Sequence, residues 1–179
     1  GSCFPKDTLA LVNTARDAGS PLKIIETVVD INNKRKIGMA DRVVAACDGS
    51  LKGKTVAILG VTFKPNTDDM RDSPSLDILP VLQKAGASIR AYDPEGMDEA
   101  CEMFKDIKWC GDSYEAMQGA DVLVIITEWN AFRGLDFERV KSLLKNPILV
   151  DLRNIYNPDD MAAVGIDYHC LGRPPGNTS

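Results

Sequence analysis

The amino end of the chain carries a cysteine in a setting that favours nucleophilic chemistry. Cys3 precedes a predicted helix that starts at Pro5, and Lys6 belongs to the first turn of that helix. The positive end of a helix dipole and a nearby ammonium both favour thiolate over thiol, and the thiolate is the reactive form. Asp7 follows Cys3 by one helical turn, where a carboxylate can orient or activate a water. The alternatives are a buried, inert thiol and a carboxylate that only stabilises the helix start.

A second set of candidate residues follows predicted strands. Phe63 and Lys64 come after a strand at 55–60 and can offer a nucleotide an apolar wall and a cation. Arg71 lies further along the same polar stretch, and its guanidinium has the fork geometry that binds phosphate or carboxylate. Arg153 follows a strand at 147–151 and should face a ligand crevice. The alternative for Lys64 and Arg71 is exposure to solvent without a ligand.

Two kinds of element are expected to position these residues. The first 48 residues predict two helices, separated by Gly19-Ser20-Pro21, of which the second spans 22–47 and should dock on another domain or subunit. After Asp48-Gly49-Ser50, apolar strand patterns alternate with helical ones. Strands are predicted at 55–60, 88–92, 121–127 and 147–151, and helices at 75–86, 96–104, 113–118, 136–145 and 159–163. This alternation predicts an α/β fold, a Rossmann-like parallel sheet with helices on both faces, over 49–179.

Ligands of such sheets bind beyond the carboxyl ends of the strands, which directs attention to the loops after Gly60, Tyr92, Thr127 and Asp151. The first of these loops lacks the GxGxxG pattern, so the sheet is not expected to bind NAD in the usual way. Asp93 closes the second strand, where a ribose-binding acid can stand, but a structural role is the preferred interpretation. Trp129 is expected to form a wall.

Composition narrows the function classes. The chain has 21 basic and 26 acidic residues, a net charge of −5 that argues against general nucleic-acid binding. No apolar run is long enough for a membrane helix, and the first residues do not resemble a signal peptide. Five irregularly spaced cysteines and one histidine predict neither a disulfide framework nor a metal site. We therefore expect a cytoplasmic protein with reduced thiols, and a disordered tail at 173–179.

Two segments resemble a known family. Gly1 to Leu11 (GSCFPKDTLAL) is similar to the catalytic-cysteine segment of the UDP-glucose 6-dehydrogenases, and Phe63 to Pro74 (FKPNTDDMRDSP) resembles their second signature. Tyr92-Asp93-Pro94 and Asp151-Leu152-Arg153-Asn154 fit in order and spacing. The resemblance runs to about Gly172 and is strongest to bacterial members. GDP-mannose and UDP-N-acetyl-mannosamine dehydrogenases are related alternatives.

The resemblance implies a reaction and a division of labour. Such enzymes oxidise UDP-glucose to UDP-glucuronate with two NAD, and an N-terminal NAD-binding domain precedes the part that this chain resembles. By resemblance, Cys3 forms a thiohemiacetal and then a thioester, and Asp7 assists the water that hydrolyses it. The resemblance places Lys6 and Arg71 on the cofactor side, and Phe63, Lys64 and Arg153 on the nucleotide sugar. It also implies a homodimer formed through the 22–47 helix.

Two other functions stay open at this point. An isolated chain without the NAD-binding domain could be a UDP-sugar-binding module with no catalysis of its own. A cysteine hydrolase would need a histidine partner for Cys3, and His169 is the sole histidine of the sequence.

Overall fold

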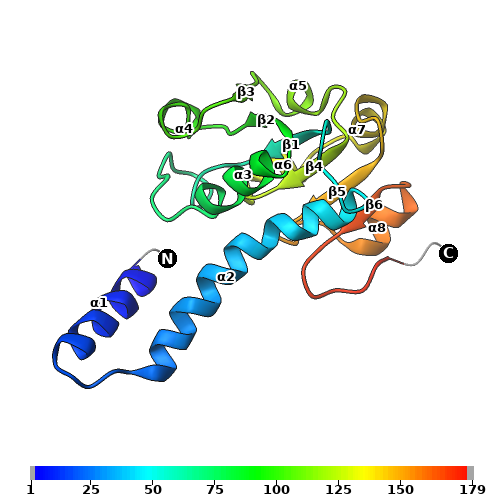
Figure 1. Cartoon of the computed structure of the whole chain (residues 1–179). Helices are drawn as coiled ribbons and strands as arrows, with labels where there is room; N and C mark the ends of the chain where they lie inside the picture. Colours follow the sequence, from blue (N-terminus) through cyan, green and yellow to red (C-terminus); the bar gives the residue numbers. More distant parts are fainter. Residues whose placement is uncertain (1–2, 177–179) are drawn as a thin grey trace.

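The computed structural model describes residues 3–176 and consists of a helical hairpin followed by an α/β unit (Figure 1). Helices α1 (Cys3–Asp17) and α2 (Lys23–Ala46) run antiparallel and form the hairpin. Gly1 and Ser2 of the cysteine segment, and 177–179 of the tail, lie outside the described residues. Helix α1 begins at Cys3 rather than at Pro5, so the cysteine belongs to the first turn itself.

The α/β unit contains one six-stranded sheet in the order β3-β2-β1-β4-β5-β6, and every neighbouring pair is parallel. Its strands are β1 (Thr55–Leu59), β2 (Ser88–Tyr92), β3 (Ile107–Trp109), β4 (Val122–Ile125), β5 (Ile148–Asp151) and β6 (Asp167–His169). This order is that of the doubly wound dinucleotide-binding fold, with the topological switch point between β1 and β4. The predicted Rossmann-like parallel sheet is confirmed.

Helices cover both faces of the sheet because successive strand residues point to opposite sides. Val56 and Ile58 of β1 pack in the core under α2, α3 (Ser75–Lys84) and α4 (Met97–Met103). Ala57 and Leu59 pack in the core on the other face. The helices of that face are α5 (Ser113–Met117), α6 (Asn130–Arg133), α7 (Phe137–Leu143) and α8 (Pro158–Ala163). Strands buried on both faces explain the unbroken apolar runs of the sequence.

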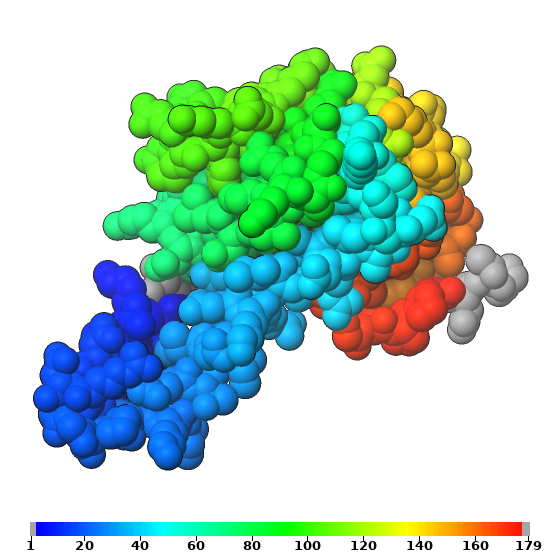
Figure 2. All heavy atoms as spheres, viewed as in Figure 1, coloured from blue at the N-terminus to red at the C-terminus, as the bar shows by residue number. Residues whose placement is uncertain are grey.

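Helix α2 belongs to both parts of the molecule. Ala40 and Val43, in its C-terminal half, are buried against the sheet unit, as expected for a docking helix. Its N-terminal half extends away from the sheet together with α1 (Figure 2). No helix within residues 3–176 combines the length and apolarity that crossing a bilayer requires.

The C-terminal tail departs from its predicted disorder as far as the structure describes it. Arg173 donates a hydrogen bond of 3.3 Å to the carbonyl oxygen of Tyr156, so this part of the segment packs back on the sheet unit.

Candidate functional site

A cavity of about 490 Å³ lies where the helical hairpin meets the carboxyl edge of the sheet. Lys6 comes from the first turns of α1, and Arg153 comes from the loop after β5. The remaining wall is supplied by α2, by the start of α3 and by residues that follow β4. The apolar part of the lining consists of Pro5, Leu9, Val29, Met39, Pro74, Ile78, Ile126, Leu152 and Leu171. Residues that are far apart in the sequence thus share one cavity.

The charges around this cavity are mostly positive. Lys6, Arg35, Lys36 and Arg153 line it, against Asp72 as the acidic lining residue. Lys36 is partly neutralised by Asp77 at 3.5 Å. A chain with a net charge of −5 therefore gathers cations at this place, an arrangement that suits an anionic ligand.

Asp151 fixes the backbone that carries Arg153. This carboxylate ends β5, is fully buried, and accepts hydrogen bonds from the Arg153 N–H at 2.9 Å and from the Ile155 N–H at 2.8 Å. The hydroxyl of Tyr168 donates to it at 2.7 Å. Burial and this hydrogen bond raise the pKa of Tyr168, so the phenol remains a donor. These hydrogen bonds therefore hold the backbone of Arg153 in a fixed turn.

The Arg153 side chain is paired with a carboxylate from the neighbouring strand end. Its Nε donates to Glu128 Oε2 at 2.5 Å and its second terminal nitrogen to Glu128 Oε1 at 2.8 Å. Partial burial alone would raise the pKa of Glu128, but the hydrogen bonds and charge of Arg153 outweigh burial and lower that pKa.

Asp93 joins three loops at the same edge. It is fully buried and accepts hydrogen bonds from the Val61 N–H at 2.7 Å, the Gly96 N–H at 2.9 Å and Trp129 Nε1 at 3.2 Å. Thr62 adds its N–H and its hydroxyl, both at 3.1 Å. The preferred structural role of Asp93 agrees with these contacts. Trp129 is buried, but it is not among the residues that line the cavity.

Cys3 and Asp7 lie one turn apart at the exposed N-terminal end of α1. The thiol is exposed, so the alternative of a buried, inert cysteine is wrong. Neither residue is among those that line the cavity, whereas Lys6, from the same turn, is. The structure therefore places the thiol beside the cavity rather than inside it.

The loop after β1 places the other predicted residues outside the cavity lining. Phe63 is half-buried and Lys64 is exposed. Arg71 is paired with Asp69 through two hydrogen bonds of 2.8 and 2.9 Å, and its side chain is 85% exposed. Arg71 lowers the pKa of Asp69 to about 2. The structure thus brings Lys6 and Arg153 together, and leaves Phe63, Lys64 and Arg71 on a neighbouring exposed loop.

Sequence reasoning missed part of the lining. Asn32, Asn33, Arg35 and Lys36 of α2 face the cavity, although the sequence marks them only as a polar interruption of an amphipathic helix. That interruption was the available signal, because polar residues on an otherwise apolar helix face need a reason. Glu128, which pairs with Arg153, was missed as well.

His169 does not meet Cys3. It lies 3.2 Å from Asp167 and lines a separate cavity of about 340 Å³ with Arg42, Cys170 and Arg173. The cysteine–histidine pair that a hydrolase would need is not formed within the described chain. Residues 3–176 also contain no cluster of His, Cys, Asp and Glu that could hold a metal ion.

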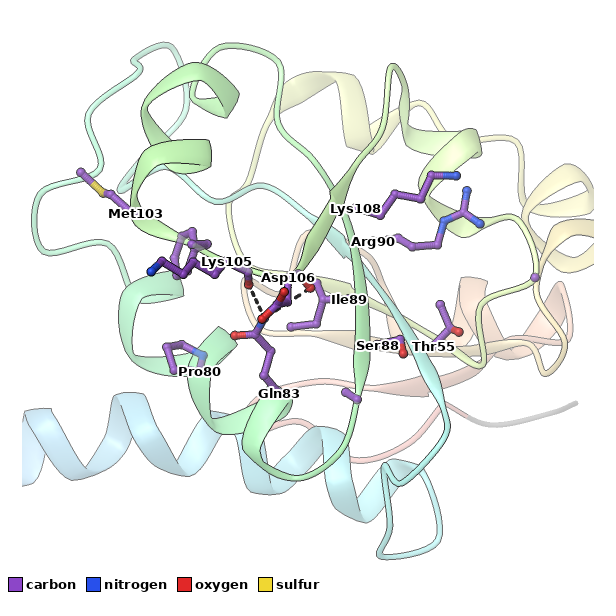
Figure 3. A pocket seen from close by; sticks show the side chains of 13 residues that line it. Thr55, Pro80, Gln83, Ser88, Ile89, Arg90, Met103, Lys105, Asp106 and Lys108 are labelled. Atoms are coloured by element: carbon purple, nitrogen blue, oxygen red, sulfur yellow. Dashed lines mark hydrogen bonds between the residues drawn. The ribbon is translucent and has the colours of Figure 1, made fainter.

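A larger cavity, of about 690 Å³, lies at the opposite edge of the sheet (Figure 3). Thr55 and Ser88 begin β1 and β2 there, and Lys105 and Asp106 precede β3. None of the sequence-predicted residues lines it. Parallel α/β sheets bind ligands at the carboxyl ends of their strands, so the smaller cavity is the better candidate despite its size.

The sheet itself does not fit NAD. Gly60 has a φ of 82° and lies so close to β4 that an added Cβ would stand 2.8 Å from the Thr127 backbone nitrogen. Gly60 and Thr127 are thus in close contact at the β1–β4 switch point, which is where a dinucleotide binds in such folds. The acid that could bind ribose, Asp93, is fully buried and occupied by internal donors. No step of a reaction is therefore assigned to NAD held by this sheet.

Sequence comparisons agree with this arrangement. Residues 57–158 match the profile of the UDP-glucose/GDP-mannose dehydrogenase family, UDP binding domain, and residues 1–34 match the central domain of the same family. A UDP-glucose 6-dehydrogenase from Rhizobium meliloti is 55% identical over 174 residues, covering 97% of this chain and 40% of that protein. One from Bacillus subtilis is 43% identical, covering 97% of this chain and 38% of that protein. The chain thus spans about 40% of the length of these curated relatives.

Solved structures show the same fold. A UDP-glucose dehydrogenase from Pyrobaculum islandicum is 30% identical with a TM-score of 0.71, over 84% of this chain and 33% of that one. An NDP-N-acetyl-D-galactosaminuronic acid dehydrogenase from Methanosarcina mazei is 26% identical with a TM-score of 0.83, over 97% of this chain and 38% of that one. Together with the match over 57–158, these similarities show that the chain belongs to the UDP-glucose/GDP-mannose dehydrogenase family.

Proposed function

We propose that this chain is the C-terminal portion of an NAD-dependent UDP-glucose 6-dehydrogenase and that it binds the nucleotide sugar. The observation that carries the proposal is the cavity shared by Lys6 and Arg153, where cations outnumber carboxylates. A nucleoside diphosphate needs such cations, and arginine binds phosphate oxygens with two N–H groups at once. The 55% identical relative supports UDP-glucose over the related nucleotide sugars.

The cysteine at the rim of the cavity supplies the covalent chemistry. In the proposed reaction the Cys3 thiolate attacks the C6 aldehyde of the sugar, which forms a thiohemiacetal and prevents release of the aldehyde. After the second oxidation the sugar is held as a thioester. Asp7, one turn further along α1, accepts a proton from the water that hydrolyses it.

Arg153 holds the substrate in this scheme, and Phe63 and Lys64 approach it from the loop after β1. The hydride acceptor is NAD, bound mainly by a domain outside this chain, with Lys6 and Arg71 on its side. Residues 1–48 then form the end of a central helical domain, and 49–179 form the UDP-sugar-binding domain. A sugar-binding module without catalysis is the alternative, and oxidation by the complete polypeptide separates the two.

Calorimetry with UDP-glucose tests the binding site. We expect Arg153→Met to weaken UDP-glucose binding by about tenfold or more, the order of one or two hydrogen bonds to a charged group. Lys105→Met, in the larger cavity at the opposite edge, is the control and should leave the affinity unchanged. The reverse result, with only Lys105→Met weakening binding, would move the site to the other edge of the sheet.

The helical hairpin supports a homodimer. Its two helices expose large apolar side chains: Phe4, Leu9, Leu11, Ile24, Val28, Ile31 and Ile37. Ile24 is 81% exposed, and Ile24, Val28 and Ile31 recur at helical spacing on α2. An exposed apolar helix face of this kind marks an interaction surface. A second copy of the chain, joined through the 22–47 helix, is the proposed occupant.

Light scattering measures this association directly. The chain should have about twice its mass of 19.5 kDa, and the pair Ile24→Lys and Ile31→Lys should return it to the monomer. Met103→Lys, at a 51% exposed apolar residue of the sheet unit, is the matched control and should stay dimeric. A monomeric mass for the unmodified chain would contradict the proposal.

A further inference from the structure

The pair between Glu128 and Arg153 leaves part of the guanidinium available. Arginine has five N–H donors. Two of them, one from Nε and one from a terminal nitrogen, bind the Glu128 carboxylate in a fork. The other three remain for a ligand, and Arg153 lines the cavity. By binding one edge of the guanidinium, Glu128 thus fixes the orientation of the N–H groups on its other edge.

The backbone of both Glu128 and Arg153 is held in place by the sheet and by hydrogen bonds of neighbouring residues. Ile125 of β4 is in register with Asp151 of β5, so the residues just beyond the two strand ends face each other. Thr127, on one side of Glu128, donates through its hydroxyl to the Thr62 carbonyl oxygen at 2.7 Å. Trp129, on the other side, is held by Asp93 at 3.2 Å. The backbone of Glu128 is therefore held in place next to Arg153.

An ordinary surface ion pair would have little effect, because solvent screens the charges and both side chains stay mobile. This pair differs because its side chains are only 28% and 35% exposed and its geometry is bidentate. Arg153 forms no other ion pair within residues 3–176. Without Glu128, the long side chain would have to be ordered by the ligand itself, at a cost in affinity.

We propose that Glu128 is a positioning residue that holds Arg153 in the orientation in which it binds the nucleotide sugar. The proposal rests on the proposed function, because it needs Arg153 to contact that ligand. Glu128 acts through Arg153 and is not itself a substrate contact.

Two substitutions separate orientation from charge. Glu128→Asp keeps the negative charge but is one methylene too short to form the fork, and we expect it to weaken UDP-glucose binding about tenfold in calorimetry. Glu128→Gln keeps the length but loses the charge, which also removes repulsion of the anionic ligand. The loss of UDP-glucose affinity caused by Glu128→Gln should therefore be smaller than the loss caused by Glu128→Asp. Glu138→Gln, which breaks the exposed pair with Lys141 on α7, is the matched control and should bind like the unmodified chain.

A double-mutant cycle tests whether the effect passes through Arg153. In an Arg153→Met background, Glu128→Asp should cause no further loss of UDP-glucose affinity. If Glu128 had a merely structural role, the loss that Glu128→Asp causes would persist in that background. Unchanged affinity of Glu128→Asp alone, or an undiminished effect in the Arg153→Met background, would overturn the inference and leave the proposed function standing. An unmodified chain that does not bind UDP-glucose, or full affinity in Arg153→Met, would overturn both.

Discussion

Serine in place of Cys3 should lower UDP-glucuronate formation by the complete dehydrogenase at least about a thousandfold, because loss of a covalent nucleophile removes a whole reaction step. A serine hydroxyl stays protonated at neutral pH, so it cannot replace the thiolate that captures the aldehyde in the proposed reaction. Cys3 does not line the cavity, so UDP-glucose binding should change little. Chromatography of UDP-glucuronate together with NADH absorbance measures the reaction, and calorimetry measures the binding.

The control for this substitution is another accessible cysteine. Cys101 on α4 is also exposed, and partial burial of its sulfur together with the nearby Asp98 carboxylate raises its pKa. Cys101→Ser should keep the activity of the unmodified enzyme. Full UDP-glucuronate production by Cys3→Ser would show that the nucleophile has been wrongly assigned.

Removal of the Asp93 carboxylate should have the largest effect on folding. Asp93→Ala would leave the buried donors Val61 N–H, Gly96 N–H and Trp129 Nε1 without their acceptor. Each unsatisfied buried donor costs about 1–3 kcal/mol, so we expect the free energy of unfolding to fall by about 3–5 kcal/mol in urea titrations. Phe63 and Lys64 should lose their fixed position at the same time.

An exposed glutamate provides the control for Asp93→Ala. Glu102 is exposed near the end of α4, and Glu102→Ala should change the free energy of unfolding by less than about 0.5 kcal/mol. A similarly small change for Asp93→Ala would mean that water replaces the carboxylate and that the three loops do not depend on it.

The sheet was largely predictable because its central strands are buried on both faces. Burial of both faces gives β1, β4 and β5 apolar runs that few other structures produce. Both edge strands, β3 and β6, were missed, since each has only three residues. The central Lys108 of β3 is moreover exposed. Helix α6 was also missed, because its four residues are too few to show the repeat of apolar positions that identifies a helix.

The site was predictable only in part, because a sequence does not say where side chains beyond the strand ends meet. Arg153 was found from its place after β5, and it does line the cavity. Glu128 stands after β4, and only the register between Ile125 and Asp151 brings it to Arg153. Arg71 is held by Asp69, a local pairing that nothing in its residue type indicates.

Helix α2 connects the helix that carries the Cys3 thiol to the sheet unit. Its 24 residues span roughly 36 Å at 1.5 Å per residue, with one end fixed to the sheet and the other supporting α1. A tilt of about 5° at the fixed end would carry the far end through about 3 Å, by the geometry of a straight rod of that length. In the proposed function, the rate of the covalent step is therefore sensitive to the angle between α2 and the sheet. Any contact that holds the free end of α2 also sets the distance from the Cys3 sulfur to the cavity.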